Sequence, residues 1–346
     1  MIRSLAAFGL ALVVAYLVTP LLRRLALHYR VVDYPNQRKI HSKPVPYLGG
    51  IAIYLGFVVA LLTVQPLPHR FLILLGGSTL ILLLGVADDL WDLPAKVKFG
   101  WQVAVALLTA LWGLRIQGLT NPFGGYINLG WLSIPLTVLW FVSLTNVMNL
   151  VDGLDGLAAG VAAIASLALT VVAAEKGQHL VALATLALSG AAAGFLPHNF
   201  NPAKIFMGDA GSMFLGFTLA GIAVQGALKG AATIALVIPV VALGVPVFDT
   251  ACAIIRRFQN GQPIYEADRQ HLHHRLLALG LTPRQAVLVL YLLSFALGSA
   301  AILIADLSPI PTAFFVIVVA GALFLLAERI GVIKPLSARN SGRTAA

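Results

Sequence analysis

Residues 71–87 read FLILLGGSTLILLLGVA, and Asp88 and Asp89 follow them directly. A helix of this length rises about 25 Å, which nearly matches the ~30 Å hydrocarbon core of a bilayer. The stretch therefore predicts a membrane-spanning helix that brings two carboxylates to one membrane surface. Similar apolar runs, separated by short polar connections, fill the rest of the chain, so this pattern decides the fold class.

The composition excludes most other classes of protein. Of the 346 residues, 59% are hydrophobic and only 10% are charged, whereas a soluble domain carries about 25% charged residues. The same numbers exclude intrinsic disorder, and the single cysteine, Cys252, excludes a disulfide scaffold. The net charge is +10, but the basic residues are scattered between apolar runs, so we expect no nucleic-acid binding. These observations leave an all-α polytopic membrane protein.

Eleven apolar runs have a length suited to crossing a bilayer. They are approximately 4–22, 47–64, 71–87, 99–114, 132–148, 157–174, 180–196, 211–228, 231–248, 285–304 and 309–327. Pro239 and Pro246 lie inside the ninth run, so we expect that helix to be kinked or broken. The connection at 115–131 predicts a small turn or hairpin.

The charged residues predict the orientation. Alternating the two sides of the membrane along the chain places 18 of the 23 Lys and Arg residues on one face, which the positive-inside rule makes cytoplasmic. The N-terminus is then outside and the C-terminus is cytoplasmic. We expect one integral-membrane domain over 1–328 and a disordered, basic cytoplasmic tail over 329–346. Eleven of the 13 acidic residues fall on the same face, which predicts an active site there.

Asp88-Asp89-Leu90-Trp91-Asp92 is the first acidic motif of this face. Carboxylates this close together repel one another unless a cation or a bound base balances them, which is compatible with Mg²⁺ binding or a general base. For an isolated Asp-Asp pair, however, we favour the alternative of a solvated helix end whose charge is neutralised by Lys96 and Lys98.

A second motif, Asn146–Gly156, contains two Asp-Gly units, at Asp152 and Asp155. Glycine lets backbone N–H groups approach an anion, and the helix that starts near Leu157 directs its positive end toward the same place. A turn followed by a helix cap explains one Asp-Gly unit but not two, so we favour a functional role.

Two further segments are rich in polar residues. The segment Asn199–Ser212 places Asp209 at a helix start, where it can bind a metal or cap the helix, and Phe206 where it can stack on a base or face lipid. The segment Asp268–Arg275 reads DRQHLHHR and could bind zinc or phosphate. A zinc site usually takes four ligands, often with cysteine, so we favour phosphate.

Arg38–Gly50, the last of these segments, contains Lys43 and other cations. They suit an anionic substrate or a lipid phosphate. The alternative is a basic flank that anchors the next helix at the membrane surface.

Together these motifs resemble the polyprenyl-phosphate N-acetylhexosamine-1-phosphate transferases, of the glycosyltransferase family 4 type. The resemblance extends over nearly the whole chain and is carried, in order, by His41–Gly50, Asp88–Asp92, Asn146–Gly156, Asn199–Ser212 and His271–His274. The stretch Asp268–His274 is typical of the bacterial UDP-GlcNAc:undecaprenyl-phosphate GlcNAc-1-phosphate transferases. The related phospho-MurNAc-pentapeptide transferases have three adjacent histidines there, which this chain lacks.

The resemblance implies a reaction and its participants. Undecaprenyl phosphate would attack the β-phosphorus of UDP-GlcNAc and release UMP, as the first membrane step of cell-envelope polysaccharide synthesis. The cofactor would be Mg²⁺, with Mn²⁺ as a substitute. The protein would lie in the bacterial cytoplasmic membrane, where it could form a homodimer.

The resemblance also implies roles for single residues. Catalysis falls to Asp88, Asp89, Asp152, His273 and His274; substrate binding to Lys43, Asn149, Asp155, Asn199, Phe206, Arg269 and His271; and metal binding to Asp209. Asp88 would deprotonate the lipid phosphate, Phe206 would stack on uracil, and the histidines would face the diphosphate or the sugar.

Two alternatives remain. One is a phospho-MurNAc-pentapeptide transferase of peptidoglycan synthesis, which would keep the fold and the chemistry. The other is a secondary anion transporter, which predicts charged groups near the middle of the membrane. The acidic residues of this chain gather at the inner ends of the predicted spans instead.

Overall fold

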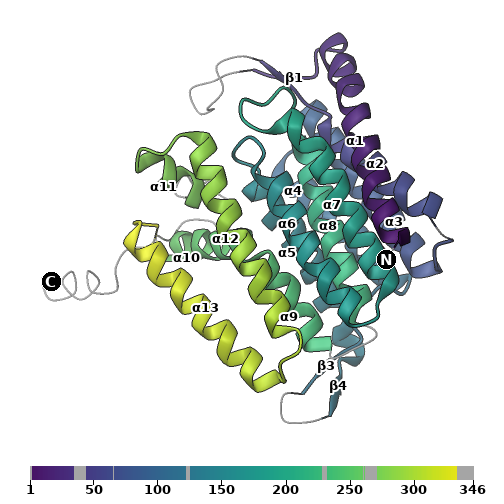
Figure 1. Cartoon of the computed structure of the whole chain (residues 1–346), viewed down its shortest axis with the longest axis vertical. Helices are drawn as coiled ribbons and strands as arrows, with labels where there is room; N and C mark the ends of the chain where they lie inside the picture. The colour runs from purple at the N-terminus through teal and green to yellow at the C-terminus, as the bar shows by residue number, and fades with distance from the viewer. Residues whose placement is uncertain are drawn as a thin grey trace, which may run out of the picture.

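The computed structural model describes residues 2–34, 44–64, 66–121, 125–227, 232–259, 261 and 271–332. Its longer helices form the bundle of Figure 1. They are α1 (Ile2–His28), α2 (Gly49–Val64), α3 (His69–Trp91), α4 (Ala95–Leu111), α5 (Ser133–Val151), α6 (Leu157–Glu175), α7 (His179–Asn199), α8 (Gly208–Ala227), α9 (Ala232–Ala242), α10 (Gly244–Gln259), α12 (Pro283–Ile304) and α13 (Pro309–Arg329). The short elements are β1 (Val32–Asp33), β2 (Val45–Pro46), β3 (Gly118–Thr120), β4 (Tyr126–Asn128), the 3₁₀ helix η1 (Gly130–Leu132) and α11 (Leu272–Ala278).

The helices confirm an all-α polytopic membrane protein. Within the described residues eight helices are long and apolar enough to cross a membrane, or nine if α9 and α10 count as one broken span. Each of the eleven predicted runs contains a helix, but α2 has only 16 residues and α4 only 17. The count of eleven spans and their orientation therefore stay predictions, as does the tail, of which 333–346 lie outside the described residues.

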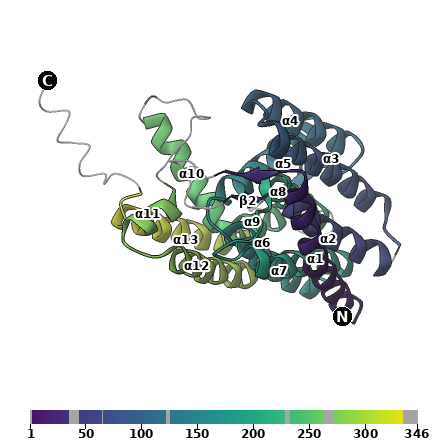
Figure 2. The ribbon, with the colours of Figure 1, turned by 90° about the horizontal axis from the view of Figure 1, so that it is seen from above.

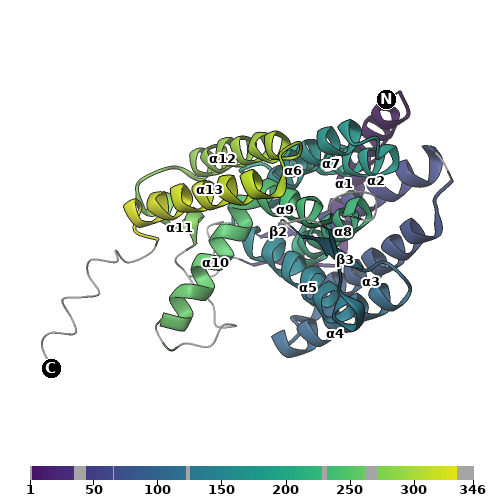
Figure 3. The same ribbon diagram turned by 90° about the horizontal axis from the view of Figure 1, so that it is seen from below.

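The break in the ninth predicted run is confirmed. Helices α9 and α10 meet at an angle of 85°. The predicted end at 248 is wrong, because α10 starts at Gly244 and continues to Gln259. Pro246 falls in the first turn of α10, where the missing N–H has no partner to lose, so the proline starts a new helix there. Figure 3 shows α10 projecting away from the bundle.

Helix α8 forms the centre of the bundle, as the view from above in Figure 2 shows. Almost all of its residues are buried, and it packs against α2, α3, α5 and α9. It is rich in glycine and alanine, which let neighbouring helices approach closely in a membrane protein. A buried hydrogen bond of 3.0 Å between the hydroxyls of Ser78 and Thr218 joins it to α3.

The two ends of the bundle carry different structures. At one end β3 and β4 pair antiparallel, with Leu119 opposite Ile127, so the predicted hairpin is confirmed. At the other end α3, α5 and α7 finish and α8 begins, so the polar motifs meet there (Figure 1). Helix α1 runs from the hairpin end to this motif end, which also holds β1.

Candidate active site

A lysine joins two of the predicted acidic residues at the motif end. The Lys98 ammonium lies 2.8 Å from Asp88 Oδ2 and 3.3 Å from Asp209 Oδ2. Helix α3 continues past the predicted end at 87 as far as Trp91, so Asp88 lies on its last turn. Asp92 ends the helix in the left-handed conformation, with φ +48°. Of the two lysines that the sequence offered as neutralising charges, Lys98 takes this position.

Asp89 faces a different partner from Asp88. Its carboxylate accepts hydrogen bonds from the backbone N–H groups of Asp209 (2.8 Å) and Ala210 (3.3 Å), so it caps the start of α8 from a neighbouring helix. An anion is favoured at this positive helix end. The two neighbouring carboxylates therefore have different roles. Asp88 binds Lys98, and Asp89 caps the helix that carries Asp209.

Gly208 makes the contact between α3 and α8 possible. Its φ is +69°, and a Cβ at this position would lie 2.2 Å from Asp89 Oδ2. We therefore expect Gly208→Ala to displace Asp89 from the helix start. The predicted cost is about 1–3 kcal/mol of stability together with a large loss of activity.

Thermal unfolding in detergent checks this prediction. Gly321→Ala in α13 is the matched control, because a Cβ there meets nothing within 4 Å. If both variants melt at the wild-type temperature, the proposed contact does not hold α8 in place.

The second motif lies beside the same carboxylates. The Asn149 amide donates a hydrogen bond of 3.0 Å to Ser212 Oγ in the first turns of α8. Asp152 follows the end of α5. Burial, and then repulsion by Asp209 and Asp155, raises the pKa of Asp152 to about 8. A large share of this carboxyl group therefore keeps its proton at neutral pH and can donate a hydrogen bond to an anion.

Asp155 and Asn199 hold two motif loops together. Asp155 Oδ2 accepts hydrogen bonds of 2.9 Å from the Asn201 amide and from the Ala203 N–H. Asn199 accepts one from the N–H of Gly156 and donates one to the carbonyl of Ile205, each at 3.0 Å. Both side chains thus shape the loop before α8. Their predicted contact with uridine stays a prediction.

Phe206 lies at the end of this loop. Its ring is 6.1 Å from that of Tyr47, centroid to centroid, at a tilt of 51°. Its carbonyl accepts a hydrogen bond of 2.9 Å from the N–H of Gly49, at the start of α2. The ring is half-buried at the motif end, and its stacking on a base stays a prediction.

The residues His271–His274, here called the histidine segment, contact the second motif, Asn146–Gly156. A Cβ on Gly153 would lie 2.5 Å from His273 Nε2, so the ring lies directly against this glycine. Burial, and then the neighbouring rings of His274 and His271, lowers the pKa of His273 to about 3. His273 is therefore a neutral ring at physiological pH. His274 lies beside it, with ring centroids 4.2 Å apart.

Some predicted residues fall outside the described part of the chain, and others were missed. Lys43 and Arg269 lie outside the described residues. Sequence reasoning gave no role to Gln102, which accepts a hydrogen bond of 2.7 Å from Asn146, or to Asp249, which contacts His271. A signal was available for Gln102, because it lies four residues after Lys98 and so shares its helix face.

The donor atoms suit a Mg²⁺ ion that also binds substrate phosphates. Within the described residues no three His, Cys, Asp or Glu side chains form a metal site on their own. Mg²⁺ is commonly held by one or two carboxylates plus phosphate oxygens and water. Asp209 is 30% exposed, and it shares one ammonium with Asp88. Asp209 and Asp88 therefore fit as the residues that would hold the ion.

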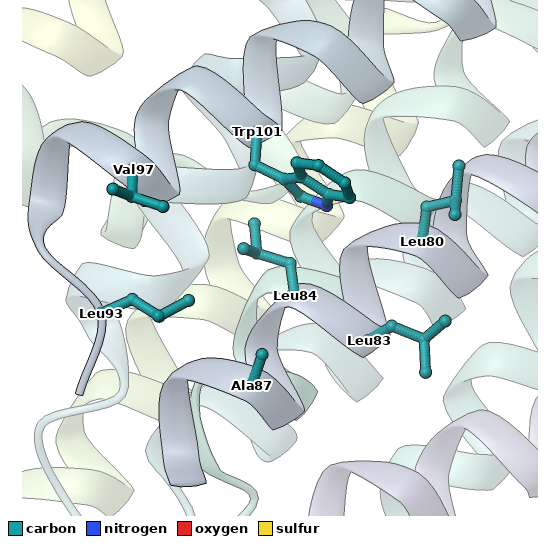
Figure 4. A pocket seen from close by; sticks show the side chains of 7 residues that line it. All are labelled: Leu80, Leu83, Leu84, Ala87, Leu93, Val97 and Trp101. Carbon is teal, nitrogen blue, oxygen red and sulfur yellow. The ribbon is translucent and has the colours of Figure 1, made fainter. Parts of the chain in front are cut away.

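An apolar cavity adjoins Asp88, Asp209 and Lys98, which together are called the acidic centre. It has a volume of about 250 Å³, and Figure 4 shows the seven side chains that line it. Ala87 directly precedes Asp88, Val97 directly precedes Lys98, and the N–H of Leu93 donates a hydrogen bond of 2.8 Å to Asp88 Oδ1. Trp101 is half exposed at its edge. Polar side chains and a partly exposed apolar surface thus meet between α3 and α4.

The sequence is similar to those of known proteins. The glycosyl transferase family 4 profile matches residues 71–227. The chain is 40% identical, over 96% of its length and 94% of the relative's, to a Bacillus subtilis protein named "Probable undecaprenyl-phosphate N-acetylglucosaminyl 1-phosphate transferase". It is 37% identical to a Mycolicibacterium smegmatis decaprenyl-phosphate N-acetylglucosaminephosphotransferase, over 84% of this chain and 80% of that one. It is 31% identical to a Yersinia pestis undecaprenyl-phosphate alpha-N-acetylglucosaminyl 1-phosphate transferase, over 88% and 84%.

This similarity covers all the helices that carry the acidic centre. The chain belongs to glycosyl transferase family 4.

Proposed function

We propose that this protein transfers N-acetylglucosamine-1-phosphate from UDP-GlcNAc to undecaprenyl phosphate. The products are undecaprenyl-diphosphate-GlcNAc and UMP. The observation that carries the proposal is the position of Lys98, between Asp88 at the end of α3 and Asp209 at the start of α8. A site that binds anionic phosphates needs a cation, which Lys98 supplies. The lipid chain needs an apolar surface next to that site, which the cavity between α3 and α4 supplies. The names of the relatives support both substrates.

The reaction exchanges one phosphoanhydride for another. An oxygen of the lipid phosphate forms a bond to the β-phosphorus of UDP-GlcNAc, and the bond from that phosphorus to the bridging oxygen of UMP breaks. Catalysis then rests on positioning and on neutralising negative charge. Lys98 would bind phosphate oxygens, while Asp88 would accept a proton if the lipid phosphate arrives protonated.

Mg²⁺ would supply a Lewis acid for the diphosphate oxygens when it is bound. Asp209 would hold the ion, with Asp88 nearby, and Mn²⁺ would substitute for it. The protonated carboxyl of Asp152 and the neutral ring of His273 would donate hydrogen bonds to the diphosphate without adding charge. Asp89 would hold the start of α8, and with it Asp209, in a fixed position next to the end of α3.

The setting of the reaction follows from the charges along the chain. We infer that the motif end faces the cytoplasm, where UDP-sugars are found, and that the protein lies in the bacterial cytoplasmic membrane. The excess of Lys and Arg in the connections at this end supports the orientation. The apolar cavity beside Asp88 would receive the part of the lipid nearest its phosphate.

A turnover assay with two donors tests the proposal. We expect purified protein with Mg²⁺ and undecaprenyl phosphate to move sugar label from UDP-GlcNAc into lipid, and not from UDP-MurNAc-pentapeptide. EDTA should abolish the transfer, and added Mg²⁺ should restore it. Label from the pentapeptide donor alone would move the protein to peptidoglycan synthesis. Uptake of an anion into liposomes without any turnover would favour a transporter.

A further inference from the structure

Asp249 lies in the second turn of α10, just beyond the 85° bend, and is 2% exposed. Both of its carboxylate oxygens meet the histidine segment. Oδ1 accepts a hydrogen bond of 2.8 Å from the N–H of Leu272, at the start of α11, and Oδ2 lies 2.9 Å from Nδ1 of His271. One contact fixes the backbone and the other fixes the ring, so a single carboxylate sets both the position and the plane of His271.

This contact also decides which ring nitrogen is free. A carboxylate only accepts hydrogen bonds, so Nδ1 of His271 must carry the proton that points at Asp249. Nε2 then remains as the nitrogen that can meet a substrate. Pairing of a carboxylate with one ring nitrogen is a common way to fix the tautomer and orientation of a working histidine.

The orientation passes on to the next histidine. The rings of His271 and His273 are stacked almost parallel, 3° apart in plane and 5.7 Å apart in centre. His273 in turn lies against Gly153 in the second motif. A chain of contacts therefore runs from the bent helix α10, through two histidines, to the loop that contains Asp152.

We propose that Asp249 is a positioning residue for the transfer reaction: it holds His271 through Nδ1 so that Nε2 faces the diphosphate of the donor. This role rests on the proposed function. The simpler role is that of a cap, in which Asp249 serves only the N–H of Leu272. Asp249→Asn separates the two roles, because the amide oxygen still accepts from Leu272 while the amide nitrogen donates toward Nδ1 and drives His271 to the other tautomer.

The kinetic test uses a double-mutant cycle. We expect Asp249→Asn to lower kcat about 10- to 100-fold while the melting temperature in detergent stays near that of the wild type. If Asp249 acts through His271, the double variant with His271→Gln is no slower than His271→Gln alone. Asp306→Asn is the matched control, since Asp306 also contacts a basic side chain, Lys176 at 2.6 Å, but at the far end of the bundle.

A spectroscopic measurement on the wild-type protein does not depend on turnover. In ¹⁵N-histidine-labelled wild-type protein we expect the His271 signal, assigned by its loss in His271→Gln, to show a protonated Nδ1. An unprotonated Nδ1 in the wild type overturns the proposal. So does a kcat for Asp249→Asn within twofold of the wild type, or losses that add up in the double variant. If the wild type turns over no donor while Nδ1 is protonated, the proposed function fails and the geometry of the pair stands.

Discussion

Replacing Asp209 by Asn is expected to lower turnover about a thousandfold or more, with little change in folding. The variant keeps the size of the side chain and the backbone N–H groups that Asp89 caps. It removes the negative charge of the main residue that the proposal assigns to holding Mg²⁺ against the diphosphate, a contribution worth several kcal/mol in the transition state. The measurement is kcat for UDP-GlcNAc at saturating Mg²⁺, together with the Mg²⁺ concentration that gives half-maximal rate.

Asp92→Asn is the matched control, because Asp92 belongs to the same acidic motif but is exposed at the end of α3. We expect its turnover to stay within twofold of the wild type. Equal losses in the two variants would mean that Asp209 has no special role. Normal activity in Asp209→Asn would remove this residue from the metal site.

Replacing Lys98 by Met is expected to lower turnover about 100- to 1000-fold, because the phosphates would lose the cation that the proposal assigns to them. It also leaves Asp88 and Asp209 without the ammonium that lies 2.8 Å and 3.3 Å from them. The remaining carboxylates would then repel both each other and the substrates. We expect weaker binding of UDP-GlcNAc as well as a lower kcat, which steady-state kinetics at varied donor concentration measures.

Lys96→Met gives the control for this prediction. Lys96 lies two residues away on the same helix and is exposed. A general dependence on positive charge at this surface would affect both variants alike. The account requires the loss in Lys98→Met to exceed that in Lys96→Met by at least tenfold, and similar losses would contradict it.

Much of the fold could be predicted from the sequence, because membrane helices follow directly from apolar length. The runs around Phe71 and Leu157 are helices at nearly the predicted positions. The helix ends were less accurate: α3 extends four residues beyond 87 and places Asp88 on the helix rather than after it. A span predicted from hydropathy ends at the first charged residue, whereas the helix itself continues as long as its backbone hydrogen bonds do.

The site could be predicted as a set of residues but not as a set of contacts. The alternation of the predicted spans placed Asp88 and Asp209 on the same side of the membrane. The structure shows that both carboxylates contact Lys98. The choice between Lys96 and Lys98 could not be made, because both lie near the acidic pair along the chain. Only the packing of α4 against α3 decides which helix face meets Asp88.

Asp249 was missed for a related reason. It lies beyond the predicted end of the ninth run, among residues expected to form a loop. Because of the bend at Ala242–Gly244 and the continuation of α10 to Gln259, Asp249 lies on a helix and contacts His271 and Leu272. A proline pattern predicts that a helix breaks, but it does not give the direction in which the next helix continues.

The central claim is that the phosphate nearest the sugar moves with it to the lipid, and labelled phosphorus tests this most directly. The protein would be incubated with undecaprenyl phosphate, Mg²⁺ and UDP-GlcNAc carrying ³²P at the β position, and lipid and nucleotide would be separated. The account predicts ³²P in the lipid fraction and unlabelled UMP in equal amount. Label that remains in UDP, with sugar transferred to the lipid alone, would contradict it.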